Sequence, residues 1–163
     1  MDWSYSRLIK DAHNGDVAIF AQGGASAFDF VNWLDSYILN ICKPTYALIT
    51  TYNTTTASRH ILETEYIVNT LKRHQITPIL ATIHPGGNAE ANARNQEINQ
   101  WVKDSGYMYL DLAELLSLNN DGVTADSNLL NPDMVHFTTP TNKIIAERFE
   151  SDFGYIFDWF PAK

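Results

Sequence analysis

The 163-residue chain is poor in cysteine, in basic residues and in long apolar runs, and each shortage excludes a class of protein. Its single cysteine, Cys42, rules out an internal disulfide framework and a multi-cysteine metal site. Eleven Lys and Arg residues stand against nineteen Asp and Glu residues, a formal charge of −8. We therefore expect neither nucleic acid nor an anionic membrane surface as a partner. No apolar run approaches the roughly 20 residues that cross a bilayer, so we expect no membrane-spanning helix.

What the chain does contain is enough apolar sequence for a core. Hydrophobic residues make up 45% of the chain and charged residues 18%, which is typical of one globular domain. We predict a single domain over residues 1–163. The end of the chain, residues 154–163, is unusually aromatic and is expected to form an added edge strand, a flap over the core or a contact with a partner.

Apolar runs alternate with segments of helical period, a pattern that predicts βα units on a mostly parallel sheet. Four strands are predicted, over residues 16–21, 46–50, 77–83 and 107–111. Helices are predicted over residues 27–41, 58–74, 90–105, 112–118 and 141–153, and a shorter one ends at His13. In the helix over 27–41, helical spacing predicts that the following side chains face the core: Phe30, Trp33, Leu34, Tyr37 and Ile41.

Ligands of open α/β sheets bind beyond the carboxyl ends of the strands, so polar residues at those ends are the candidates for chemistry. Asp133 and His136 lie three residues apart on one loop, where the carboxylate can accept from Nδ1 and leave Nε2 as a general base. Asn53 follows the strand over 46–50, and Gly24 follows the strand over 16–21. A carboxamide N–H and an unobstructed backbone N–H at these positions would suit an oxyanion hole. Taken singly, each also fits an ordinary loop or turn residue.

The order of these residues resembles that of the SGNH (GDSL-like) hydrolases along nearly the whole chain. Residues 23–27 (Gly-Gly-Ala-Ser-Ala) resemble the second block of the family, and residues 51–54 (Thr-Tyr-Asn-Thr) its third. Residues 133–138 (Asp-Met-Val-His-Phe-Thr) resemble the last block. The resemblance implies a three-layer, flavodoxin-like α/β sandwich and ester hydrolysis, with His136 as base, Asp133 as its orienting carboxylate, and Gly24 and Asn53 as oxyanion donors.

Two departures from the family pattern matter. The first block, Gly-Asp-Ser after a strand, has no counterpart, so we expect the chain to be incomplete at its amino-terminal end. The central strand of the sheet is then missing or supplied from elsewhere, by an upstream segment, a second chain or the aromatic tail. Thr51 and Thr54 replace the usual Gly and Asp of the third block. Ser4, Ser6 and Ser26 are the candidate replacement nucleophiles, and none of them fits well.

The leading hypothesis is a serine-dependent esterase acting on a small ester or an acylated carbohydrate, with its serine outside these residues. The first alternative is an inactive SGNH-like domain that binds a glycan or a protein partner. A second alternative is a metal-dependent phosphoesterase using Asp133 and His136, but no tight His and Asp cluster supports it. We predict no metal and no cofactor.

The other histidines have simpler interpretations. His84 follows the third predicted strand and is interpreted as a loop residue. His13, His60 and His74 are expected at helix ends or surfaces, where a cation near a helix carboxyl end is common.

Overall fold

The computed structural model describes residues 4–13, 17–22, 25–52, 56–86 and 88–158. These residues form two compact units. One unit comprises residues 1–19 and 126–163, and the other comprises residues 20–125. That residues 1–163 form a single domain stays a prediction.

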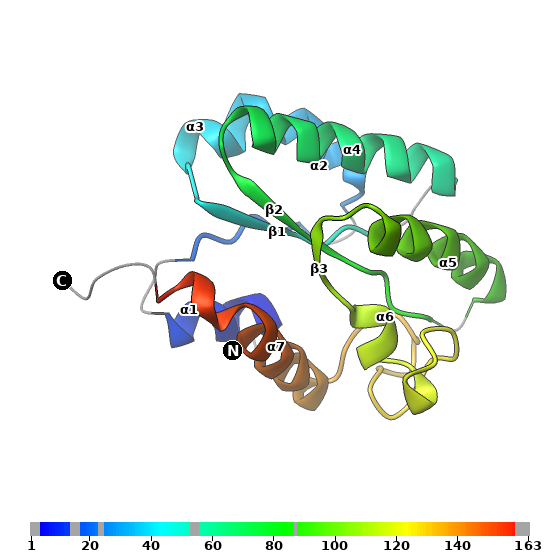
Figure 1. The fold of residues 1–163 in the computed structure, drawn as a ribbon. Helices are drawn as coiled ribbons and strands as arrows, with labels where there is room; N and C mark the ends of the chain where they lie inside the picture. The colour runs from blue at the N-terminus through cyan, green and yellow to red at the C-terminus, as the bar shows by residue number, and fades with distance from the viewer. Residues whose placement is uncertain (1–3, 14–16, 23–24, 53–55, 87, 159–163) are drawn as a thin grey trace. The chain divides into compact units, whose positions relative to one another are not determined.

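The larger unit is a parallel sheet with helices packed against it (Figure 1). Its three strands, in the order β1-β2-β3, are β1 (Tyr46–Ile49), β2 (Thr77–Ala81) and β3 (Met108–Leu110). Its helices are α2 (Ala27–Trp33), the π-helical η1 (Leu34–Ile38), α3 (Leu39–Ile41), α4 (Ala57–Arg73), α5 (Ala89–Asp104), α6 (Leu112–Leu115) and the 3₁₀ turn η2 (Leu118–Asn120). The register pairs Ile49 with Leu80, and Ala81 with Leu110. The predicted α/β class with a mostly parallel, flavodoxin-like sheet is confirmed.

Two apolar clusters bind the helices to the sheet. In the first, Leu34 of η1 packs with Ile67 and Leu71 of α4, against Ala47 and Ile49 of β1. In the second, the clustered side chains come from α4, β2, the connection after β2, and α5, and are Ala57, Val68, Leu80, Ile83, Ile98 and Val102. Because both clusters include α4, this helix is the central packing element of the larger unit.

The predicted strand over residues 16–21 is wrong for its described part. Residues 17–22 have no regular secondary structure, and β1 pairs only with β2 among the described residues, so β1 lies at the edge of the described sheet. A parallel strand needs a neighbour for its N–H and C=O groups, and apolar residues alone do not supply one.

The predicted helix over residues 27–41 forms, but two of its five inward side chains face solvent. Tyr37 is 58% exposed and Ile41 is 61% exposed, whereas Leu39 is only 4% exposed. The cause is the π-helical turn η1, which inserts a residue and rotates the following turn out of phase. The buried positions therefore step from Leu34 to Leu39, five residues on.

The smaller unit pairs two helices. Helix α1 (Tyr5–Ala12) packs against α7 (Thr139–Phe153), and a 3₁₀ turn, η3 (Gly154–Ile156), follows α7. His13, directly after α1, connects the end of α1 to α7 and to the residues after η3. Its Nε2 lies 2.8 Å from Glu150 Oε1 of α7, and its ring stacks on that of Phe157 with 3.5 Å between the ring centroids. Residues 154–158, the described part of the aromatic tail, are helical or turned and include the buried Ile156, and the role of the tail stays a prediction.

Candidate active site

Asp133 and His136 lie on a closed loop of the smaller unit. Leu130 and Phe137 form an antiparallel bridge at its base, and the Asn131 N–H donates to the His136 carbonyl at 2.8 Å. Met134, at the tip, has a φ of 57° and donates its N–H to the Asn131 carbonyl. A left-handed residue is what lets so short a segment reverse, so the loop holds its side chains in a defined arrangement.

Asp133 accepts three hydrogen bonds from this loop. The backbone N–H groups of Val135 and His136 both donate to Asp133 Oδ1 at 2.9 Å, and His136 Nδ1 lies 2.8 Å from Asp133 Oδ2. The backbone N–H of His136, its ring and the N–H of Val135 lower the pKa of Asp133 to about 2. Asp133 is therefore ionised near neutral pH and acts only as an acceptor.

The ionised carboxylate determines the tautomer of His136. Since Asp133 can only accept, the neutral ring carries its proton on Nδ1 and has its lone pair on Nε2. The His136 side chain is 77% exposed, so Nε2 is accessible to a reacting group. The predicted contact between the His136 ring and the Asp133 carboxylate is present, and the roles of the two residues as base and orienting carboxylate stay a prediction.

The two predicted oxyanion donors, Gly24 and Asn53, lie outside the described residues. Their described neighbours meet, however: Ser26 and Tyr52 form a parallel bridge in the larger unit. The convergence of Gly24, Asn53 and His136 stays a prediction.

Ser26 has a structural role. Its hydroxyl donates to Asp29 Oδ2 at 2.7 Å, and the Ser26 N–H donates to the same oxygen at 2.8 Å. This is the capping box of α2, which satisfies backbone groups at the start of the helix. Ser4 and Ser6 contact each other, with 3.2 Å between their hydroxyl oxygens, at the start of α1. Neither arrangement resembles an activated nucleophile.

Two histidines, His60 of α4 and His84 after β2, are buried, and their burial was not predicted from the sequence. His60 is 3% exposed, with Nε2 3.1 Å from Thr51 Oγ1, and burial lowers its pKa to about 4 despite the opposing charge of Glu63. His84 is 5% exposed, and its ring centroid lies 6.2 Å from that of Tyr52. The surface interpretation of His60 is wrong. Its spacing from Ala57, Thr64 and Ile67 follows the buried stripe of α4, a signal that the sequence contained.

The connection from β2 to α5 is held by two asparagines. Asn99 Oδ1 accepts from the Ile83 N–H at 2.7 Å and its Nδ2 donates to the Ile83 carbonyl at 2.8 Å. Asn92 makes the same pair of bonds to Gly86, at 2.8 and 2.7 Å. Each carboxamide thus satisfies both backbone groups of one residue, and His84 lies between the two contacts.

A buried network of side chains lies next to this connection. Asp111, whose side chain is 7% exposed, lies 2.7 Å from Lys103 Nζ and accepts from Thr82 Oγ1 at 2.9 Å. Burial alone would raise the pKa of Asp111, but hydrogen bonds from Lys103, from the Glu114 N–H and from Thr82 outweigh it and lower the pKa. The network joins α5 to the ends of β2 and β3.

Within the part of the chain that the structure describes, no three His, Cys, Asp or Glu side chains group as a metal ion would require. None of the described helices is long and apolar enough to cross a membrane.

No protein-family model matches the chain, and no curated protein sequence matches it. Solved structures do. A G-D-S-L family protein from Desulfitobacterium hafniense DCB-2 is 17% identical, with a TM-score of 0.76 over 93% of this chain and 89% of that one. A carbohydrate esterase family 3 structure from Talaromyces cellulolyticus is 12% identical, with a TM-score of 0.71 over 97% and 93%. The psychrotrophic esterase EstA from Pseudoalteromonas sp. is 15% identical, with a TM-score of 0.71 over 96% and 88%.

At these identities the similarity concerns the fold, and it extends over nearly the whole chain and nearly the whole of each neighbour. The predicted fold family is therefore confirmed: the chain has the fold of the SGNH (GDSL-like) hydrolases.

Proposed function

We propose that this protein hydrolyses carboxylic esters, with His136 as general base and Asp133 as the carboxylate that orients it. The observation that carries the proposal is the 2.8 Å contact between His136 Nδ1 and Asp133 Oδ2, with Nε2 left for a substrate or nucleophile. The fold shared with esterase structures supports it.

In the proposed mechanism a serine hydroxyl attacks the ester carbonyl while His136 Nε2 takes its proton. The negative charge on the carbonyl oxygen is stabilised by the Gly24 N–H, the Asn53 carboxamide and the N–H of the serine itself. His136 then returns the proton to the leaving alcohol, and water repeats the sequence on the acyl-enzyme. In this proposal the attacking serine is not Ser26, because the Ser26 hydroxyl already donates to Asp29 as part of the helix cap.

The substrate class in this proposal is a small ester or an acylated carbohydrate. The Talaromyces cellulolyticus neighbour is described as a carbohydrate esterase, which favours acyl groups on sugars. An acidic chain also suits a neutral substrate better than a polyanionic one.

The test measures hydrolysis of p-nitrophenyl acetate by the protein expressed from its complete reading frame. His136→Ala is expected to reduce kcat/KM about 1,000-fold or more while leaving the fold intact. His74→Ala, which removes a partly exposed histidine of the larger unit, is the matched control and should retain full activity. Unchanged hydrolysis in His136→Ala would contradict the proposal.

The structural role of Ser26 also favours a second candidate, an SGNH-like domain that binds a glycan or a protein without hydrolysing it. Labelling with a fluorophosphonate, which reacts with an activated serine, separates the two. A labelled serine located by mass spectrometry supports the esterase. Absence of both labelling and turnover in the complete protein supports the binding domain.

A further inference from the structure

The larger unit carries a hollow between α4, α5 and the turn that precedes β3. Five residues line it: Glu65 and Asn69 of α4, Trp101 of α5, and Ser105 and Tyr107 of the following turn. Tyr107 directly precedes β3, so the hollow lies at the amino end of that strand. Thr51, Tyr52 and His84 follow β1 and β2 at the opposite end of the sheet. A ligand in this hollow would therefore bind at the other end of the sheet from Thr51, Tyr52 and His84.

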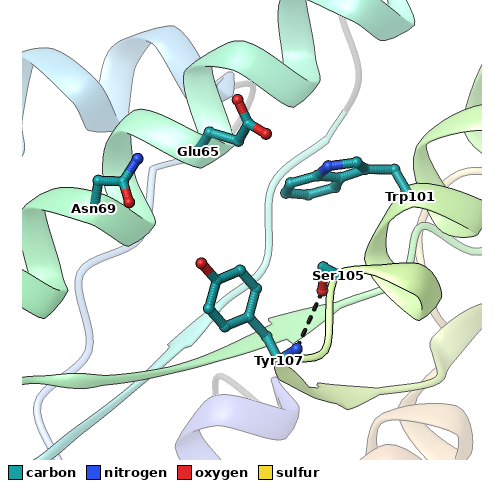
Figure 2. Close-up of a pocket in the computed structure, with 5 residues that line it drawn as sticks. All are labelled: Glu65, Asn69, Trp101, Ser105 and Tyr107. Carbon is teal, nitrogen blue, oxygen red and sulfur yellow. Dashed lines mark hydrogen bonds between the residues drawn. The ribbon is translucent and has the colours of Figure 1, made fainter.

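The aromatic walls of the hollow are held rigidly. Trp101 and Tyr107 are half-buried and pack against the apolar cluster that contains Leu80 and Ile98. Ser105 fixes the turn between them, because its hydroxyl donates to the Val102 carbonyl at 2.6 Å and accepts from the Tyr107 N–H at 3.3 Å. Figure 2 shows the Trp101 ring extending from α5 toward the space above Tyr107. Preformed rings cost little conformational entropy when a ligand binds on them.

The polar groups of the hollow are available to a ligand. Glu65 and Asn69 are exposed, and the Tyr107 hydroxyl is directed toward their helix (Figure 2). Among the described residues, none forms a hydrogen bond with the Glu65 carboxylate, the Asn69 carboxamide or the Tyr107 hydroxyl. These three groups together offer hydrogen-bond donors and acceptors to which two neighbouring hydroxyl groups of one ligand could bind.

The charges select the type of ligand. The Glu65 carboxylate disfavours an anion. Lys72 Nζ lies 5.2 Å from the centroid of the Tyr107 ring, so a protein cation already occupies that aromatic contact and would repel a cationic ligand. A neutral ring with several hydroxyl groups and an apolar C–H face is repelled neither by the Glu65 carboxylate nor by the Lys72 ammonium. The volume, about 410 Å³, falls within the range of small-molecule sites and accommodates a sugar ring.

We propose that the hollow formed by Glu65, Asn69, Trp101 and Tyr107 binds a neutral sugar unit of an oligo- or polysaccharide. The C–H face of the sugar stacks on Trp101, and its hydroxyl groups pair with Glu65, Asn69 and the Tyr107 hydroxyl. The site holds the protein on a glycan chain and performs no chemistry. It does not depend on the esterase proposal.

The test titrates the protein with xylohexaose, cellohexaose and mannohexaose by isothermal calorimetry. At least one is expected to bind with a Kd of roughly 0.1–1 mM, and hexagalacturonate and hexameric chitosan are expected not to bind. Glu65→Ala combined with Asn69→Ala should weaken binding at least about tenfold. Both side chains are exposed, so this variant is expected to fold. Trp101→Ala should abolish binding, with circular dichroism reporting whether its fold is intact.

Tyr37→Ala is the matched control, because Tyr37 is an exposed aromatic residue of the same unit on η1. It should bind as the unmodified protein does. Failure of all three neutral hexasaccharides to bind would overturn the proposal. So would equal binding by the Glu65 and Asn69 double variant, since the sugar would then be held elsewhere. Neither result concerns His136, so the esterase proposal stands or falls separately.

Discussion

Acidification is expected to destabilise the protein through His60. This imidazole is 3% exposed, and burial holds its pKa at about 4, against 6.5 for an unperturbed histidine. Between these two values the unfolded chain binds a proton that the folded chain does not. The free energy of unfolding therefore falls as the pH falls from about 6.5 toward about 4.

The size of the effect follows from the two pKa values. Near pH 5 the unfolded imidazole is almost fully protonated and the folded one is roughly one-tenth protonated. Lowering the pH from about 7 to about 5 should then remove roughly 2 kcal/mol of stability through His60 alone, by the linkage of proton binding to folding. Other groups also titrate in this range, so the measurement has to isolate the contribution of one residue.

Urea denaturation at both pH values, followed by tryptophan fluorescence, supplies that measurement for the unmodified protein and for His60→Gln. The glutamine cannot be protonated, and its carboxamide can still hydrogen-bond the Thr51 hydroxyl. The stability lost on acidification should be roughly 2 kcal/mol smaller in His60→Gln than in the unmodified protein. His74→Gln, a change at a side chain that is 45% exposed, should keep the full loss. Equal losses in the unmodified protein and in His60→Gln would refute the reasoning.

Three further changes test other contacts. Asn99→Ala removes both hydrogen bonds to Ile83 and leaves two buried backbone groups unpaired, so the free energy of unfolding measured in urea should fall by about 2–5 kcal/mol. Gln96→Ala, which removes a carboxamide on the exposed face of α5, is the control and should lower it by less than about 1 kcal/mol. Asp111→Asn leaves the Lys103 ammonium without its carboxylate partner and should also destabilise the folded protein. Because the pKa of Asp111 is lowered in the folded state, the difference in unfolding free energy between the variant and the unmodified protein should shrink as the pH falls below about 4. Asp133→Asn should lower the kcat of ester hydrolysis about 10,000-fold with little change in KM, since the ring of His136 loses the acceptor that fixes its tautomer; a change in KM alone would contradict that role.

Much of the larger unit could be predicted because its signals are local. Four predicted elements form within a residue or two of their predicted ends: the strands over 46–50, 77–83 and 107–111 and the helix over 58–74. Apolar runs, prolines and glycines act on the nearby backbone, so a short stretch of sequence is enough to predict such elements. The strand over 16–21 has the same apolar composition, yet its described part is not a strand. Pairing depends on a neighbour that can be distant in sequence, and no local pattern reports whether that neighbour is present.

The same distinction separates the parts of the candidate site. The Asp133 and His136 contact spans three residues, so spacing alone predicts it, and the structure contains it. The convergence of this pair with Gly24 and Asn53 requires the folding of more than 80 residues between Asn53 and His136, and it stays a prediction. The π-helical turn at Leu34 shows the limit of periodicity even within one helix, because one inserted residue changes which side chains are buried.

The paired carboxamide contacts of Asn92 and Asn99 bear on how the protein can respond to a ligand. They join residues 83–86 to α5, so this crossover and the helix should shift as one rigid body. His84 lies inside the joined segment and should keep its place when a ligand binds nearby. If a ligand binds at this end of the larger unit, the unit is then expected to adapt by side-chain rotation, for example at Tyr52, rather than by movement of the crossover.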